Sequence, residues 1–202
     1  MAYRRTPRIQ ARIDAQRASL VDAAAAVLAE SGYAGCTVSA VAARAGVATG
    51  TVYNHFASKV DLVVEVFRRV VSHEVDVVRQ ASASGTAAES TTAVLETFAR
   101  RALKAPKRAY VLLAEPVDPA IDELRLEFRR AFRDVLTGAI SRGVATGELP
   151  EQNASVVAAA LVGALGGALV GPLATGADDA ETVPTLIEFT LRAIGARADA
   201  HA

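Results

Sequence analysis

Apolar residues recur at intervals of three and four along most of the 202-residue chain, and no stretch alternates with period two for long enough to predict a sheet. Together with the breaks that Gly and Pro introduce, this pattern predicts an all-α protein of about nine helices without an internal repeat. The expected helices cover residues 8–31, 38–45, 49–56, 59–81, 93–104, 107–115, 119–142, 154–173 and 182–195, with a loop at 82–91.

Short polar residues and glycines set the predicted boundaries of the first helices. Gly32 is placed to end the first helix, and Gly46 to end the second. Thr37 can cap the start of the second helix. Ser58, followed by Asp61 three residues later, has the spacing of a capping box at the start of the fourth helix. The sequence therefore predicts two short helices between two long ones.

Residues 36–59, CTVSAVAARAGVATGTVYNHFASK, contain a short helix, a glycine turn and a second short helix. This order predicts a helix-turn-helix at about 37–56, in which the second helix enters the major groove of DNA. Val52 and Phe56 are four residues apart and form its expected inner face. The outer faces then carry Thr49, Gly50, Thr51, Tyr53, Asn54 and His55.

These outward residues have the chemistry that DNA reading requires. Asn54 can form two hydrogen bonds with adenine, and Thr49 can bond a base or touch a thymine methyl group. Tyr53 and His55 are expected to bond phosphate oxygens, although His55 is equally suited to a structural hydrogen bond. Gly50 allows the backbone to approach a phosphate closely.

Three further residues flank the predicted reading helix. Lys59 adds positive charge in the first turn of the fourth helix, where backbone N–H groups already favour an anion. Arg44 is either a phosphate contact or a solvated charge at the end of its helix. Thr37 is expected to cap its helix and, at the DNA surface, also to bond phosphate.

Charge is distributed unevenly although the formal net charge is zero. Residues 1–60 carry seven Arg and Lys against three Asp and Glu, whereas the remainder carries fifteen against nineteen. A basic end on an acidic body is expected if only the N-terminal part meets phosphate.

The sequence does not have the pattern of an enzyme. We find no nucleophile–base motif, phosphate-binding loop or His/Cys cluster with metal spacing, so neither a cofactor nor a metal is expected. The single cysteine, Cys36, is expected to be a small filler before a helix rather than a redox sensor. The N-terminus has positive charge but no apolar segment behind it, and the protein is expected in the cytoplasm.

Several motifs resemble the DNA-binding domain of the tetracycline-repressor (TetR) family of bacterial regulators. The matching residues are Gly32-Tyr33, Thr37, Val41-Ala42, Ala45-Gly46-Val47, Gly50-Thr51-Val52-Tyr53, His55-Phe56 and Ser58-Lys59. The resemblance implies a DNA-binding domain at 1–58 and an effector-binding and dimerisation domain at 59–202. It also implies a repressor that binds a palindromic operator in double-stranded DNA as a homodimer and is released by a small-molecule effector.

The sequence departs from the family at the start of the reading helix. Ala48-Thr49 stands where the family usually has Ser-Lys, and Asn54 replaces a familiar second aromatic residue. Ala48 cannot cap, so Thr49 is a candidate for that role and would then be less free to read a base. The operator sequence cannot be transferred by analogy.

A long uncharged segment, residues 152–177, is rich in Ala and Gly. By length alone it can span a bilayer, and a small membrane protein is one alternative. The absence of aromatic or basic residues at its edges instead favours a helix buried on all sides, including by a partner subunit. In the family, the last two helices pair with those of a second subunit. The residues expected at that interface are Gly163, Gly167, Gly171, Leu186 and Leu191.

The fourth to seventh helices resemble the effector-binding core of the family. Apolar candidates for lining a largely apolar effector are Phe67, Phe98, Tyr110, Leu112, Phe128 and Phe132. His73, Arg101 and Glu115 are the candidate polar contacts. Each of these residues also suits an ordinary core or surface role, so a DNA-binding regulator without a small ligand is the other alternative.

Overall fold

The computed structural model describes residues 6–176 and 180–196, and these residues form nine α-helices and no strand. This confirms the expected all-α architecture. The helices are α1 (Pro7–Gly35), α2 (Val38–Ala45), α3 (Thr49–Tyr53), α4 (Lys59–Ala81), α5 (Ala87–Lys104), α6 (Pro106–Leu113), α7 (Pro119–Ala145), α8 (Ala154–Thr175) and α9 (Thr182–Ala193).

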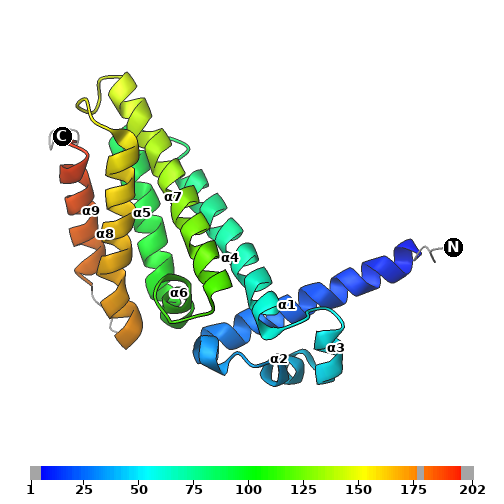
Figure 1. The fold of residues 1–202 in the computed structure, drawn as a ribbon. Helices are drawn as coiled ribbons and strands as arrows, with labels where there is room; N and C mark the ends of the chain where they lie inside the picture. The colour runs from blue at the N-terminus through cyan, green and yellow to red at the C-terminus, as the bar shows by residue number, and fades with distance from the viewer. Residues whose placement is uncertain (1–5, 177–179, 197–202) are drawn as a thin grey trace.

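The first three helices form a head at one end of a bundle made by the other helices (Figure 1). Helix α1 extends away from the bundle towards the N-terminus, and α2 and α3 lie together on one side of it. Helices α8 and α9 lie side by side at the opposite edge. The last two helices of the described chain are therefore far from the predicted reading helix.

Two hydrophobic clusters hold these helices together. The head core contains buried residues of α1 to α4, including Leu20, Leu28 and Val41, and also Val111 and Ile121 of α6 and α7. The body core joins α4, α5, α7, α8 and α9 through Val78, Leu95, Leu136, Leu165 and Leu186, given in the order of the helices. Burial of this apolar surface is the main stabilising contribution to both parts.

Helix α4 belongs to both cores. Leu62, Val63 and Val66 of its first half are buried in the head core, whereas Val75 and Val78 of its second half are buried in the body core. Helix α4 therefore packs on both sides of the predicted division of the chain, and the domain boundary after residue 58 stays a prediction.

The predicted caps at the head form as expected. The Thr37 hydroxyl accepts a hydrogen bond from the Ala40 N–H at 3.1 Å, and the Ser58 hydroxyl accepts one from the Asp61 N–H at 3.1 Å. Gly46 ends α2 with φ of 67°, a left-handed conformation that glycine adopts without steric cost. The helix ends around the turn are thus encoded locally.

Several predicted boundaries differ from the structure, including the end of α6 at Leu113 rather than at residue 115 and the end of α7 at Ala145 rather than at residue 142. Helix α5 begins at Ala87 rather than at residue 93, because Thr86 and Glu89 form a reciprocal capping box that shortens the expected loop. Helix α1 ends at Gly35, although Gly32 within it has a non-helical backbone with φ of 68° and ψ of −174°. The predicted stop at Gly32 is therefore a sharp break, followed by a short further turn.

Cys36 fills the space beneath this turn, as the sequence predicted for a small apolar residue. Its side chain is buried, and burial raises the pKa of the thiol to about 11. Because the thiolate is the reactive form, we expect the folded protein to resist thiol labelling at pH 8. Labelling with a chromogenic disulfide should be slow in buffer and rapid in guanidinium chloride. Rapid labelling of the folded protein would contradict the buried assignment.

Candidate functional site

The candidate reading helix α3 is shorter than predicted. It ends at Tyr53 rather than at residue 56, and Asn54 occupies its C-terminal cap position. Val52 and Phe56 are both buried, which confirms the predicted inner face. Phe56 reaches the core from the turn after the helix, because the backbone N–H of Phe56 still bonds to the Val52 carbonyl at 3.0 Å.

The polar residues predicted to face DNA lie mostly on the surface. Thr49, Gly50, Tyr53 and Asn54 are exposed, and Thr51 is half-buried. Thr49 does not cap α3: the cap position is Ala48, which provides no side-chain hydrogen bond, and Thr49 is the first helical residue. The Thr49 hydroxyl therefore does not cap the helix, and its role in base reading stays a prediction.

Two of the predicted phosphate contacts have partners within the head. The His55 ring nitrogen Nε2 lies 3.0 Å from the Gln16 amide oxygen. The Arg44 guanidinium lies 2.6 Å from the Glu30 carboxylate, and both side chains are well exposed. An exposed ion pair of this kind contributes about 0–1 kcal/mol, so phosphate can compete for Arg44. His55 matches the structural alternative, since its bond links α1 to the end of the reading segment.

Lys59 anchors the start of α4 to the end of α1. Its ammonium group donates a hydrogen bond of 2.6 Å to the Tyr33 carbonyl and lies 4.0 Å from the centre of the Tyr33 ring. Burial is the largest cause of the raised pKa of Tyr33. Lys59 therefore connects the two long helices of the head, and any phosphate contact would be made from this half-buried position.

The loop between α6 and α7 contacts the same corner from the body. The Glu115 carboxylate accepts a hydrogen bond from the Tyr33 N–H at 3.0 Å, and a Cβ at Gly32 would lie 3.0 Å from that carboxylate. Arg125 of α7 binds the carbonyls of Val111, Leu112 and Glu115. Glu115 was predicted to contact an effector, but the structure places it at this joint between head and body.

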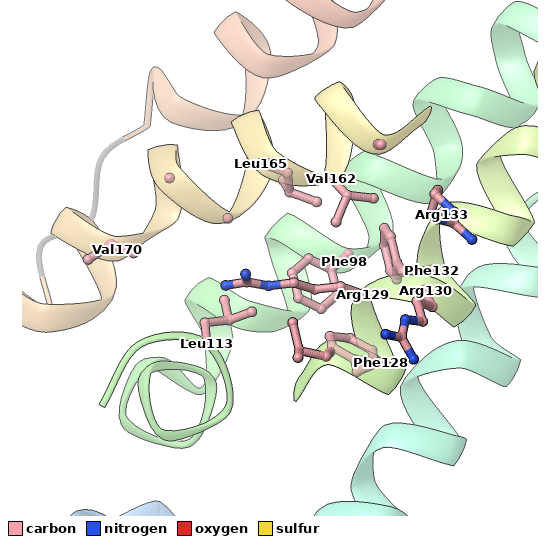
Figure 2. Close-up of a pocket in the computed structure, with 15 residues that line it drawn as sticks. Phe98, Leu113, Phe128, Arg129, Arg130, Phe132, Arg133, Val162, Leu165 and Val170 are labelled. Carbon is pink, nitrogen blue, oxygen red and sulfur yellow. The ribbon is translucent and has the colours of Figure 1, made fainter. Parts of the chain in front are cut away.

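A groove lies between α7 and α8, which we call the α7–α8 groove (Figure 2). Its volume is about 530 Å³, within the usual range for small-molecule sites. Three of the predicted effector residues line it: Phe98, Phe128 and Phe132. Their rings form a cluster with centroid separations of 4.9 to 5.9 Å. The α8 wall includes Gly163 and Gly167, which the sequence assigned to a dimer interface.

Three arginines of α7 border this apolar groove. Figure 2 shows Arg129 extending across it towards Leu113, whereas Arg130 and Arg133 point to the other side. Arg133 pairs with Asp134 at 3.0 Å. Among the described residues, Arg129 and Arg130 form no ion pair. The groove therefore combines an aromatic floor with unneutralised positive charge, the arrangement that suits an apolar molecule carrying an anionic group.

The other predicted effector residues lie elsewhere. Phe67 and Leu112 belong to the head core, and Tyr110 packs beside the body core. His73 is exposed on α4. Arg101 forms two hydrogen bonds of 2.7 and 2.9 Å with the buried Glu74 carboxylate. None of the expected polar contacts lines the α7–α8 groove: Arg101 and Glu115 join neighbouring helices, and His73 lies on the surface.

The sequence did not lead us to predict the three arginines that border the α7–α8 groove. The side chains at 126, 129, 130 and 133 have the three- and four-residue spacing of one helix face, which was a usable signal. A charged face opposite an apolar stripe is, however, usually solvent-facing. Only the packing of α8 beside α7 shows that this face borders a groove.

The outer face of α8 and α9 carries exposed apolar surface. Gly163, Gly167 and Gly171 are exposed, and a Cβ at any of them would meet nothing within 4 Å. Val156 and Phe189 are exposed by 63% and 42%. Leu191 is half-buried, whereas Leu186 is buried in the body core of its own chain and offers little surface to a partner.

Comparison with known proteins decides the family. The family described as "Bacterial regulatory proteins, tetR family" matches residues 20–66. The transcriptional repressor KstR2 of Rhodococcus jostii is 30% identical over 136 residues, which cover 65% of this chain and 67% of the relative. The chain belongs to the TetR family of transcriptional regulators. It is thus a DNA-binding regulator and not an enzyme.

Two further proteins match this chain over most of their length. The fatty acid metabolism regulator protein of Bacillus subtilis is 26% identical over 135 residues, covering 65% of this chain and 70% of that protein. The solved structure of the fatty acid degradation regulator FadR from Bacillus halodurans superposes with a TM-score of 0.76 at 22% identity. That alignment covers 94% of this chain and 97% of FadR, so the two share a fold.

Asn54 is exposed and Lys59 is half-buried, and substitutions at the two positions lead to different expected phenotypes. Asn54→Ala should change the preferred operator sequence, at about 1–3 kcal/mol for the base concerned. Lys59→Ala should weaken binding to all sequences and reduce the salt dependence by about one phosphate contact. Selection of binding sites from random DNA and salt titrations of operator affinity measure the two effects.

Arg79→Ala provides a matched control at the opposite end of α4, where Arg79 is exposed and pairs with Asp76. It should change neither the preferred sequence nor the salt dependence. An unchanged binding profile for Asn54→Ala would show that Asn54 does not read a base.

Proposed function

We propose that this regulator is a repressor that binds a palindromic operator as a homodimer and is released by an amphipathic, anionic effector. The effector class proposed is a long-chain acyl thioester of coenzyme A. The observation that carries this proposal is the α7–α8 groove, with its three phenylalanines and unpaired arginines. An acyl chain would occupy the aromatic part, and phosphate groups would meet Arg129 and Arg130.

The relatives support this class of effector. A structure of FadR from Bacillus subtilis contains stearoyl-CoA, and it superposes on this chain with a TM-score of 0.75 at 21% identity. The alignment covers 87% of this chain and 98% of that FadR. The similarity to a repressor, KstR2, supports repression as the outcome of DNA binding.

Release is proposed to act through α4 and the Glu115 joint together. An effector in the α7–α8 groove displaces α7, which packs along α4 and also holds the α6–α7 loop through Arg125. Because Lys59 and Glu115 both bind Tyr33, movement of either element changes the position of the head. An effector that favours the altered arrangement shifts the population away from DNA.

Dimerisation is proposed to use the outer face of α8 and α9. Helix α8 is long and apolar enough to cross a membrane, but Leu161, Leu165 and Leu169 bury one side of it in the bundle. A second copy packed on the glycine ridge would cover much of the other side. The two reading helices would then face successive major grooves, about 34–36 Å apart. Because α8 is proposed to pack in the bundle and against a second copy rather than in a membrane, we also propose a cytoplasmic location.

Acyl-CoA binding should weaken operator binding. We expect a saturated long-chain acyl-CoA to release a footprinted operator fragment, while free coenzyme A and the free fatty acid do so poorly. Arg129→Gln combined with Arg130→Gln should raise the concentration required by about tenfold or more, since charge-assisted hydrogen bonds to phosphate are lost. Fluorescence anisotropy of labelled operator measures release.

Arg100→Gln is the matched control, because Arg100 is exposed on α5 and pairs with Glu96 outside the groove. It should respond to acyl-CoA as the unmodified protein does. If acyl-CoAs and other metabolites all fail to release intact DNA complexes, the regulator is not controlled by a small ligand, and this part of the proposal is wrong.

Gly→Ala substitutions on α8 distinguish an effect on dimerisation from an effect on the stability of each protomer. Within one chain, Gly171→Ala has open space for its Cβ and should favour the helix by up to about 1 kcal/mol. At an interface of closely approaching helices, the same Cβ should raise the dimer dissociation constant. Sedimentation over a range of concentrations measures it.

Gly166→Ala is the control for this experiment, because Gly166 also has open space but lies off the ridge formed by 163, 167 and 171. It should leave dimerisation nearly unchanged. Equal dissociation constants for Gly171→Ala and the unmodified protein would place the partner on another surface.

A further inference from the structure

Phe128 borders three separate hollows. It lines the α7–α8 groove and a small cavity of about 20 Å³ beside the Glu74–Arg101 pair. It also lines a second groove of about 520 Å³ between α4 and α7, which we call the α4–α7 groove. Since Phe128 is itself buried, its ring separates the hollows rather than projecting into solvent.

The α4–α7 groove has the composition needed to accept more of an apolar chain. Val71 and Val75 of α4 and Leu124 and Ala131 of α7 are among its lining residues. The charged lining residues are Arg68, Asp76, Arg79 and Glu127. An alkyl chain that passed the position of Phe128 would therefore meet aliphatic side chains on α4.

Neighbouring rings hold Phe128 in this position. Its centroid lies 5.9 Å from that of Phe98 and 5.8 Å from that of Phe132. Phe132 also lines the α7–α8 groove, but it lines neither of the other two hollows. The two phenylalanines are therefore neighbours in one cluster with different positions relative to α4.

We propose that Phe128 forms the end wall of the effector site and sets the longest acyl chain that it accepts. This inference rests on the proposed binding of acyl thioesters in the α7–α8 groove. Removal of the Phe128 ring joins this groove to the α4–α7 groove, so a longer chain can continue along α4. Removal of the Phe132 ring widens the first groove without opening that route.

The affinity of a homologous series tests this wall directly. Each methylene that finds buried space tightens binding by about fourfold, and the gain stops when the chain end meets a wall. We expect binding of saturated acyl-CoAs, from octanoyl to eicosanoyl, to reach a limit in the unmodified protein. In Phe128→Ala the gain should continue by several methylenes, so that the longest members bind at least about tenfold more tightly than to the unmodified protein.

Phe132→Ala is the matched control, since it loses an identical ring from the same cluster. It should keep the limiting length of the unmodified protein. Phe128→Leu, which retains more of the core volume, should extend the limit in the same direction by fewer methylenes and covers the case in which Phe128→Ala does not fold. An unchanged limit in the folded Phe128 variants, or an equal extension in Phe132→Ala, would overturn the proposal.

A neutral series separates this inference from the proposed effector class. The same variants are titrated with linear fatty alcohols, using displacement of a fluorescent apolar dye as the signal. If alcohols show the Phe128-dependent limit while no thioester binds, the wall is supported and the acyl-CoA assignment is wrong. If both series bind without the extension, the wall is wrong and the effector class stands. If neither series binds any variant, both proposals fail.

Discussion

One continuous helix in two hydrophobic cores is the constraint on which this architecture depends. Helix α4 has 23 residues, a length of roughly 35 Å at 1.5 Å per residue. Val63 is buried among residues of the head, and Val78 is buried among residues of the body. Neither half can change its packing without changing the position of the helix, because both cores are close-packed. Coupling between the reading head and the body follows from this sharing.

The joint at Tyr33 adds a second, polar connection between the same parts. Lys59 binds its carbonyl from α4, and Glu115 binds its N–H from the loop after α6. The break at Gly32 makes this possible, since a side chain there would crowd the Glu115 carboxylate. The head is therefore held by Lys59 of α4 and by Glu115 of the α6–α7 loop. The second contact depends on α7, because Arg125 of α7 holds that loop and α7 also borders the α7–α8 groove.

Helix α8 serves two surfaces because it lacks charge and large side chains on much of its circumference. Leu161 and Leu165 fill the body core, while Gly163 and Gly167 leave space beside α7 and an open ridge outside. The uncharged composition of α8, which resembles that of a membrane span, instead leaves room for the α7–α8 groove and, as we propose, for a second copy of the chain. On α7, the phenylalanines and arginines of neighbouring turns supply the opposite wall.

The sequence alone determined the caps of α2 and α4, the glycine that ends α2 and the inner face of the reading segment. Thr37, Gly46, Ser58, Val52 and Phe56 act through neighbours only a few residues away, so local patterns were sufficient. Other assignments required contacts between distant segments. Only the tertiary structure decided that Glu115 meets Tyr33, that Arg101 pairs with Glu74 and that Arg129 borders a groove. The physical reason is that burial and charge pairing depend on which helices pack together, and helical periodicity does not contain that information.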